Sequence, residues 1–117
     1  MLLLALAMVA PAVAKRLPAP KVDPVVHQNI RYEVPNDSGR LAHVEVWDVK
    51  KNVKLWDVRV FRNQISRELE EDVQWVFVKS LRLYKGRLIV TAEDGRCYSL
   101  DPRTNAVEKL AREPKGP

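Results

Sequence analysis

Strand patterns closed by tight-turn signals constrain this chain more than any other feature. Within residues 53–62 the apolar Trp56, Val58 and Val60 alternate with the charged Asp57 and Arg59, which is the two-residue period of a half-buried strand. The dipeptide Asp94-Gly95 is a preferred two-residue hairpin turn, because both of its positions favour a positive φ. The strand patterns cover residues 29–34, 40–48, 53–62, 74–84, 87–93, 96–100 and 106–110. Together they predict a mainly β fold of antiparallel meander sheets with about seven strands.

One segment interrupts the β pattern. Residues 63–72 place Ile65 and Leu69 four positions apart, on one face of a helix. Asn63 or Ser66 is available to cap the start of such a helix. We therefore expect one short helix near residues 63–72.

The amino-terminal residues have the features of a signal peptide. Residues 2–14 contain no charge, and Lys15 follows them directly. This run is shorter than the roughly 20 residues of a membrane-spanning helix, and its last three residues fit the small-x-small pattern before a cleavage site. No Lys or Arg precedes the run, so an ordinary buried amino-terminal segment is the alternative. We expect residues 1–14 to be a signal peptide cleaved near Ala14, and the mature protein to be periplasmic or extracellular.

The rest of the chain divides by composition into a leader, one domain and a tail. Residues 15–28 hold three prolines and no clear periodicity, which is typical of an extended leader. Residues 29–112 contain all the strand patterns and are expected to form a single β domain. Residues 113–117 are expected to be a disordered tail. No stretch after the signal is apolar enough to span a membrane.

Charged and aromatic residues suggest a binding surface. The net charge of +5 favours contact with anionic polymers without demanding a nucleic acid. The tryptophans are expected to pack in the core, because a small sheet needs bulky buried residues; they are Trp47, Trp56 and Trp75. Aromatic side chains left on one sheet face beside basic residues would stack on sugars or bases. The candidate basic surface consists of Arg59, Arg82 and Arg87.

Patterns for catalysis and metal binding are weak. Cys97 is the only cysteine, so no intramolecular disulfide forms. His27 and His43 do not provide the close-spaced ligand pairs of a structural zinc site, and no serine lies in a G-x-S-x-G turn. A Cys97–His43 pair and the paired carboxylates at 70–72 and at Glu93-Asp94 are the remaining candidates for a small thiol enzyme or hydrolase. We expect no enzyme activity, metal or cofactor; whether Cys97 stays free or bridges two chains is left open.

Two turns share a pattern at a spacing of 53 residues. Asp48 to Asn52 and Asp101 to Asn105 each follow an apolar residue and read Asp, any residue, a base, any residue, Asn. We expect each Asp to accept hydrogen bonds from turn amides and each Asn to adopt a left-handed backbone at the far corner. Each copy lies between two predicted strands, which favours an internal repeat.

The second copy resembles the blade motif of quinoprotein-like β-propellers. Residues 92–105 follow the pattern A-x-D-G-x-x-Y-A-L-D-x-x-T-G, with Asn105 in place of the last Gly, and residues 47–56 end in the closing Trp of the motif. The resemblance implies about two blade-like sheets, whereas a propeller needs about four to eight. It therefore implies a free-standing domain, a ring completed by further copies, or a sheet that docks on another β protein. The family holds its cofactor in a complete ring, so no cofactor is expected here.

These patterns favour binding over catalysis. An open meander leaves unpaired edge strands that invite pairing. We expect a non-enzymatic exported binding or scaffold module, which holds a protein partner or a second copy of itself through a sheet face or an edge strand. The alternative is a module that binds an anionic envelope polymer or nucleic acid through a basic sheet face.

Overall fold

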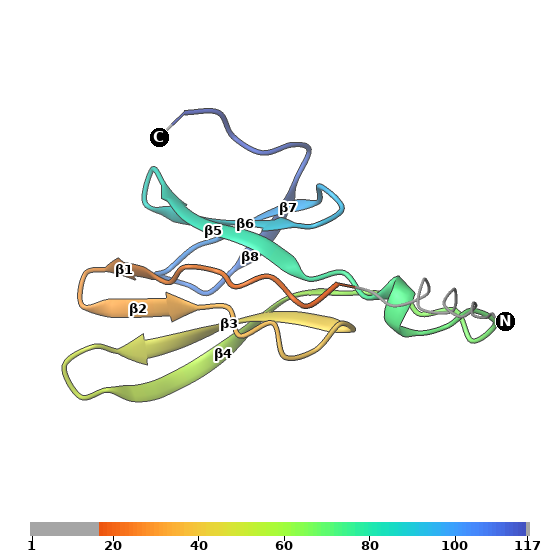
Figure 1. Cartoon of the computed structure of the whole chain (residues 1–117). Coiled ribbons are helices and arrows are strands. Elements are labelled where there is room, and N and C mark those ends of the chain that lie inside the picture. Colours follow the sequence, from red (N-terminus) through yellow and green to blue (C-terminus); the bar gives the residue numbers. More distant parts are fainter. Residues whose placement is uncertain (1–16, 117) are drawn as a thin grey trace, which may run out of the picture.

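The computed structural model describes residues 17–116, which form two four-stranded antiparallel sheets (Figure 1). The strands of the first sheet lie in chain order: β1 (Val25–His27), β2 (Ile30–Glu33), β3 (Leu41–Asp48) and β4 (Val53–Arg62). The second sheet has the same arrangement, with β5 (Val78–Tyr84), β6 (Arg87–Ala92), β7 (Cys97–Leu100) and β8 (Val107–Leu110). The mainly β, antiparallel fold predicted from the sequence is confirmed. The predicted signal peptide lies outside the described residues.

The first strand was not predicted. β1 lies inside the segment 15–28 that composition assigned to an extended leader. It pairs with β2 through a two-residue turn, Gln28-Asn29, in which both residues have positive φ (53° and 66°). This conformation is the one that two-residue hairpins require. The described chain therefore has eight strands, and the sheet-forming region begins before residue 29.

The segment 63–72 does not form the predicted helix. The helical structure of the described residues is a single 3-10 turn, η3 (Asp72–Gln74). Before it, the Gln74 side-chain amide replaces helical hydrogen bonds: its oxygen accepts from the Ser66 N–H at 2.7 Å, and its nitrogen donates to the carbonyl groups of Ser66 and Glu70, both at 3.0 Å. Leu69 is 62% exposed, so no buried apolar face stabilises a helix here.

The inner faces of the two sheets form one hydrophobic core. The fully buried inward side chains alternate along their strands with outward ones, as the two-residue period requires; they include Val44, Leu88, Val90 and Leu100. Phe61 and Tyr98 extend this core with rings stacked at 5.2 Å between centroids. Trp56, which was expected to pack in the core, is 45% exposed, because the β3–β4 hairpin projects away from the second sheet (Figure 1). Trp47 and Trp75 are half-buried.

Two asparagines join the sheets. Asn36 takes the place of a strand residue beside Val78: its amide oxygen accepts from the Val78 N–H at 3.1 Å, and its nitrogen donates to the Val78 and Pro20 carbonyls, both at 2.9 Å. The buried Asn63 donates to the Gly39 carbonyl at 2.7 Å and accepts from the Arg96 guanidinium at 2.6 Å. A buried amide is stable only when its donors and acceptors are satisfied, so these two residues fix the connection between the sheets.

The carboxyl-terminal segment packs on the second sheet. After β8 the chain runs back across this sheet (Figure 1). The Arg82 guanidinium donates to the Glu113 carboxylate at 3.2 Å and to the Gly116 carbonyl at 2.8 Å. The Thr91 hydroxyl donates to the other Glu113 oxygen at 3.2 Å. Residues 113–116, which were expected to be a disordered tail, therefore contact β5 and β6.

Candidate functional site

The first candidate site is the free edge of strand β4. β4 pairs with β3 alone, so its other edge carries no strand in the described part of the chain. The hairpin end of this strand is apolar and open to solvent: Val53 is 45%, Leu55 39% and Trp56 45% exposed. Native proteins usually blunt a long edge strand with charge. Here one charge, Lys54, lies within the stretch 53–56, and Asp57 and Arg59 lie beyond it; all three residues are exposed.

An imidazole lies between two carboxylates on the outer face of the first sheet. His43 Nδ1 lies 2.9 Å from Asp57 Oδ1, and His43 Nε2 lies 3.0 Å from Asp37 Oδ1. Burial alone lowers the pKa of the His43 imidazole, but the hydrogen bonds and charges of the two carboxylates outweigh burial and raise the pKa above its ordinary value. His43 and Asp57 line a shallow hollow of about 340 Å³ together with Leu41 and Arg59.

Asp57 also holds a cation along β4. Lys54 Nζ lies 2.9 Å from Asp57 Oδ2. The hydrogen bond from Lys54 is the main cause that lowers the pKa of the Asp57 carboxyl, and the His43 contact acts in the same direction. Asp57 is therefore a carboxylate at neutral pH. The outer face of this edge carries fixed charges of both signs.

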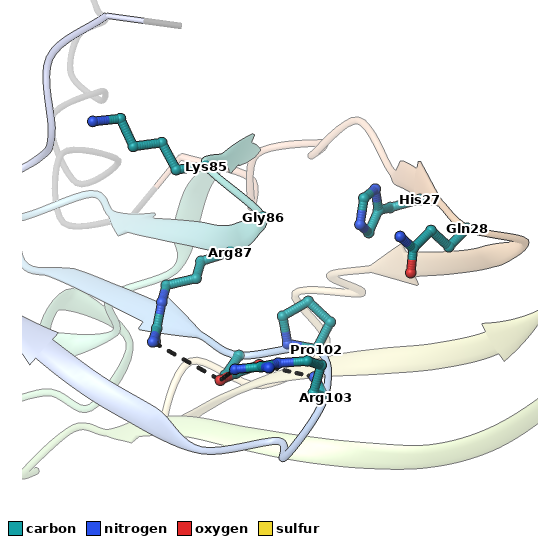
Figure 2. Close-up of a pocket in the computed structure, with 8 residues that line it drawn as sticks. His27, Gln28, Lys85, Gly86, Arg87, Pro102 and Arg103 are labelled. Atoms are coloured by element: carbon teal, nitrogen blue, oxygen red, sulfur yellow. Dashed lines mark hydrogen bonds and ion pairs between the residues drawn. The ribbon is translucent and has the colours of Figure 1, made fainter.

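The second candidate site is a pocket where three hairpin turns meet (Figure 2). It has a volume of about 320 Å³. The β1–β2 turn contributes His27 and Gln28 on one side, and the β5–β6 and β7–β8 turns contribute the rest (Figure 2). The remaining lining residues are Lys85, Gly86, Arg87, Asp101, Pro102 and Arg103. Among the lining residues Lys85, Arg87 and Arg103 are basic and Asp101 is acidic, so the net charge of the lining is positive.

The three arginines proposed from the sequence do not form one surface. Arg59 lies on the outer face of the first sheet, beside Leu41 and His43. Arg82 and Arg87 alternate with the buried Leu81 and Leu88, so they lie on the outer face of the second sheet. The Arg82 guanidinium is occupied by the carboxyl-terminal segment. Arg87 alone of the three lines the turn pocket.

The two repeated turns share a backbone hydrogen bond and a left-handed Asn, but their Asp side chains bind amides at different positions: the third residue after Asp48 and the second after Asp101. Asp48 Oδ1 accepts from the Lys51 N–H at 2.9 Å, and Asp101 Oδ1 accepts from the Arg103 N–H at 2.9 Å. In both turns the Asn N–H donates to the Asp carbonyl at 2.8 Å. Asn52 and Asn105 have positive φ, 54° and 64°.

The Asp94-Gly95 turn differs from the two-residue hairpin that the dipeptide predicted. Only Gly95 has a positive φ, of 95°. The Gly95 N–H donates to the Ala92 carbonyl at 3.0 Å, and the Ala92 N–H donates to the Arg96 carbonyl at 2.8 Å. These bonds enclose a three-residue loop that ends in a left-handed glycine, the next most common hairpin type.

Cys97 and His43 do not form a thiol–imidazole pair. The Cys97 thiol is buried in the second sheet, 3.7 Å from the Thr91 hydroxyl and 3.6 Å from the Gly95 carbonyl. The His43 imidazole faces its two aspartates on the first sheet. Within residues 17–116, no group of three His, Cys, Asp or Glu side chains converges on a metal position. The described residues also contain no helix long and apolar enough to cross a membrane.

Comparison with protein-family models, curated proteins and solved structures found no match for this chain.

Sequence reasoning missed most of the turn pocket. His27 was assigned to the leader, and Arg103 was treated only as the base of the repeated turn pattern. One signal was present: the turn 85–87 carries two basic residues, and the turn 101–103 carries one. What the sequence does not contain is the packing that brings the turns of β1–β2, β5–β6 and β7–β8 to the same end of the molecule.

Proposed function

We propose that this protein is a non-enzymatic binding and scaffold module that acts through edge strand β4. The observation that carries this proposal is the solvent-exposed stretch from Val53 to Trp56, apolar except for Lys54, at a sheet edge that no strand of residues 17–116 covers. Such an edge offers backbone N–H and C=O groups to an added strand, and its side chains give the contact specificity. Exposed tryptophan at a contact surface contributes strongly to binding.

The partner that fits this edge is a second copy of the chain. When two β4 strands pair in antiparallel fashion around Val58, Asp57 of each copy lies opposite Arg59 of the other, and Trp56 lies opposite Val60. Opposite charges and aromatic–β-branched pairs at facing positions each stabilise a sheet by about 0.2–1 kcal/mol. Lys54 then faces Arg62, but the Lys54 ammonium is already paired with Asp57. The contact is two-fold symmetric, so it closes as a dimer.

Light scattering of the full chain and of three charge variants tests this contact. We expect the wild type to be dimeric and the single variants Asp57→Arg and Arg59→Asp to shift toward monomer, because each brings like charges together twice. The double variant Asp57→Arg/Arg59→Asp restores the opposite charges across the interface, and we expect it to regain the dimer.

The charge reversal also removes contacts inside one chain, so the double variant is the decisive comparison. Asp57→Arg breaks the bonds of Asp57 to His43 and Lys54, and the second substitution does not repair them. Recovery of the dimer in the double variant therefore reports on the interface alone. A wild type that stays monomeric throughout the concentration series contradicts the proposal. A dimer that Trp56→Ser leaves unchanged contradicts it as well.

We propose further that the two sheets are copies of one blade-like unit. This is supported by their identical strand order and by the matching hydrogen bond from the Asn N–H to the Asp carbonyl in the Asp48–Asn52 and Asp101–Asn105 turns. A ring completed by further copies would have the mass of a trimer or tetramer in the same scattering experiment, whereas pairing of β4 alone gives a dimer.

Export is the third part of the proposal. Its support is the uncharged segment 2–14 followed by Lys15. Amino-terminal sequencing of the protein expressed from its full reading frame is expected to start at Lys15. Recovery of the intact amino terminus in the cytoplasm would contradict export.

A further inference from the structure

The turn pocket combines charges that no contact within the protein fully uses. Arg87 and Arg103 bring two positive charges, against the single carboxylate of Asp101. Lys85 also lines the pocket, but its side chain extends away from the arginines and its ammonium lies 5.3 Å from the centre of the Tyr84 ring (Figure 2). Each guanidinium has five N–H donors. Among the described residues, Arg87 meets Asp101 at 3.9 Å and Arg103 meets it at 3.5 Å. With side chains 48% and 84% exposed, both arginines have most of their donors open to the pocket or solvent.

Asp101 holds this pair of arginines in place. Its side chain is only 11% exposed and accepts a hydrogen bond from the Arg103 N–H at 2.9 Å. That backbone hydrogen bond is the main cause that lowers the pKa of the Asp101 carboxyl, so the group stays ionised. Figure 2 shows Arg87 and Arg103 approaching the same point from two different turns. One carboxylate thus positions two guanidinium groups without neutralising the pocket.

The chemistry of the opposite wall is compatible with an oxygen-rich ligand. His27 and Gln28 face the arginines across Pro102 (Figure 2). Gln28 and Gly86 have left-handed backbones, which keep both turns tight and leave the space between them open. Guanidinium groups match phosphate and sulfate oxygens by paired N–H donors.

We propose that this pocket binds the phosphate group of an anionic ligand, with Arg87 and Arg103 as its principal donors. Two sources of the same chemistry fit: a small phosphate ester or a phosphate polymer. This site is separate from the β4 edge, so its failure leaves the proposed scaffold function untouched.

Titration of the full chain with inorganic phosphate and with polyphosphate, followed by backbone amide NMR shifts, tests the site. We expect the largest shifts at residues 27–28, 85–87 and 101–103. The variant Arg87→Gln/Arg103→Gln is expected to weaken binding by at least about tenfold, the effect of losing one charge-assisted hydrogen bond. Polyphosphate that binds far more tightly than phosphate identifies the polymer as the source, and similar affinity per phosphate identifies the small ester.

A matched control separates a site from general attraction by a basic protein. Arg67→Gln/Lys79→Gln removes the same two charges at exposed positions outside the pocket. We expect this variant to bind both probes like the wild type. Equal weakening in the two double variants, or shifts spread over all basic residues, would overturn the proposal. So would the absence of any shift at the pocket residues with both probes.

Discussion

His43 shows how a single residue links charge to folding. Its imidazole lies within hydrogen-bond distance of Asp37 and Asp57, which raise its pKa above the value of about 6.5 that an unfolded chain gives. The folded protein therefore binds this proton more tightly than the unfolded protein. The resulting stabilisation is fully present below about pH 6.5 and is lost as the pH rises through the raised pKa of the folded state.

We predict that His43→Gln removes this part of the pH dependence. Urea denaturation of the wild type should show a free energy of unfolding that falls as the pH rises from about 6.5 through the raised pKa of the folded protein. The variant should show a flatter profile over that window. Asp37→Asn, which removes one of the two carboxylates, should give an intermediate slope. An unchanged slope in His43→Gln would contradict the assignment.

Whole strands were the most predictable elements. Strand β4 begins and ends where the alternating pattern of 53–62 does, and β3 starts one residue later than predicted. Their signals are local, because side-chain alternation and turn residues lie within the strands themselves. The helix predicted near residues 63–72 does not form, because the side chain of Gln74 makes the hydrogen bonds of this loop. Gln74 lies after the predicted helix, eight residues beyond the possible cap Ser66. β1 was missed because three residues with little burial give no period to detect.

The candidate sites were less predictable than the strands. Arg87 was singled out as basic and lies in the pocket, but its neighbour Arg103 comes from another turn. Trp56 was expected in the core because a small sheet needs bulky buried residues, and it does lie on the inner side of the sheet, where it pairs with Val46. The second sheet does not extend far enough to cover Trp56. The length of that sheet depends on residues distant in the sequence, so the pattern around residue 56 cannot predict it.

The repeated turns provide a test at the level of an element. An alanine in the left-handed region costs about 1–2 kcal/mol, whereas asparagine and glycine tolerate it. We predict that Asn52→Ala and Asn105→Ala each lower the free energy of unfolding by about 1 kcal/mol. The two effects should be similar, because both Asn residues have a positive φ and donate the same hydrogen bond to the Asp carbonyl. Chemical denaturation measures both changes.

Two substitutions control for this effect. Asn52→Gly keeps the left-handed backbone accessible and should stay near the wild type. Lys51→Ala changes an exposed neighbour without positive φ and should alter stability by less than about 0.5 kcal/mol. Clearly unequal effects of the two Asn→Ala variants would argue against equivalent turns.

At the scale of the whole molecule, the carboxyl-terminal segment closes the outer face of the second sheet. Glu113 contacts Thr91, and Thr91 lies 3.7 Å from the Cys97 thiol, which is 2% exposed. We predict that truncation after Leu110 increases the rate at which a thiol reagent modifies Cys97. The accompanying loss of stability should be about 1 kcal/mol or less, since the Arg82–Glu113 pair is partly exposed.

Lys115→Ala serves as the control for truncation, because Lys115 is exposed and the segment remains in place. Its thiol reactivity should equal that of the wild type. Equal modification rates in the truncated and intact chains would show that the segment does not protect this face.

Along the eight described strands, the chain passes from one sheet to the other once, between β4 and β5. During synthesis on the ribosome, all strands of the first sheet therefore emerge before any strand of the second. Their local antiparallel pairings form without waiting for distant residues, which favours rapid formation. The inner face that carries Val44 and Val58 nevertheless stays uncovered until β5 to β8 arrive. A nascent chain of this architecture exposes an apolar sheet for the time needed to translate its second half, and such intermediates are the species that chaperones protect from aggregation.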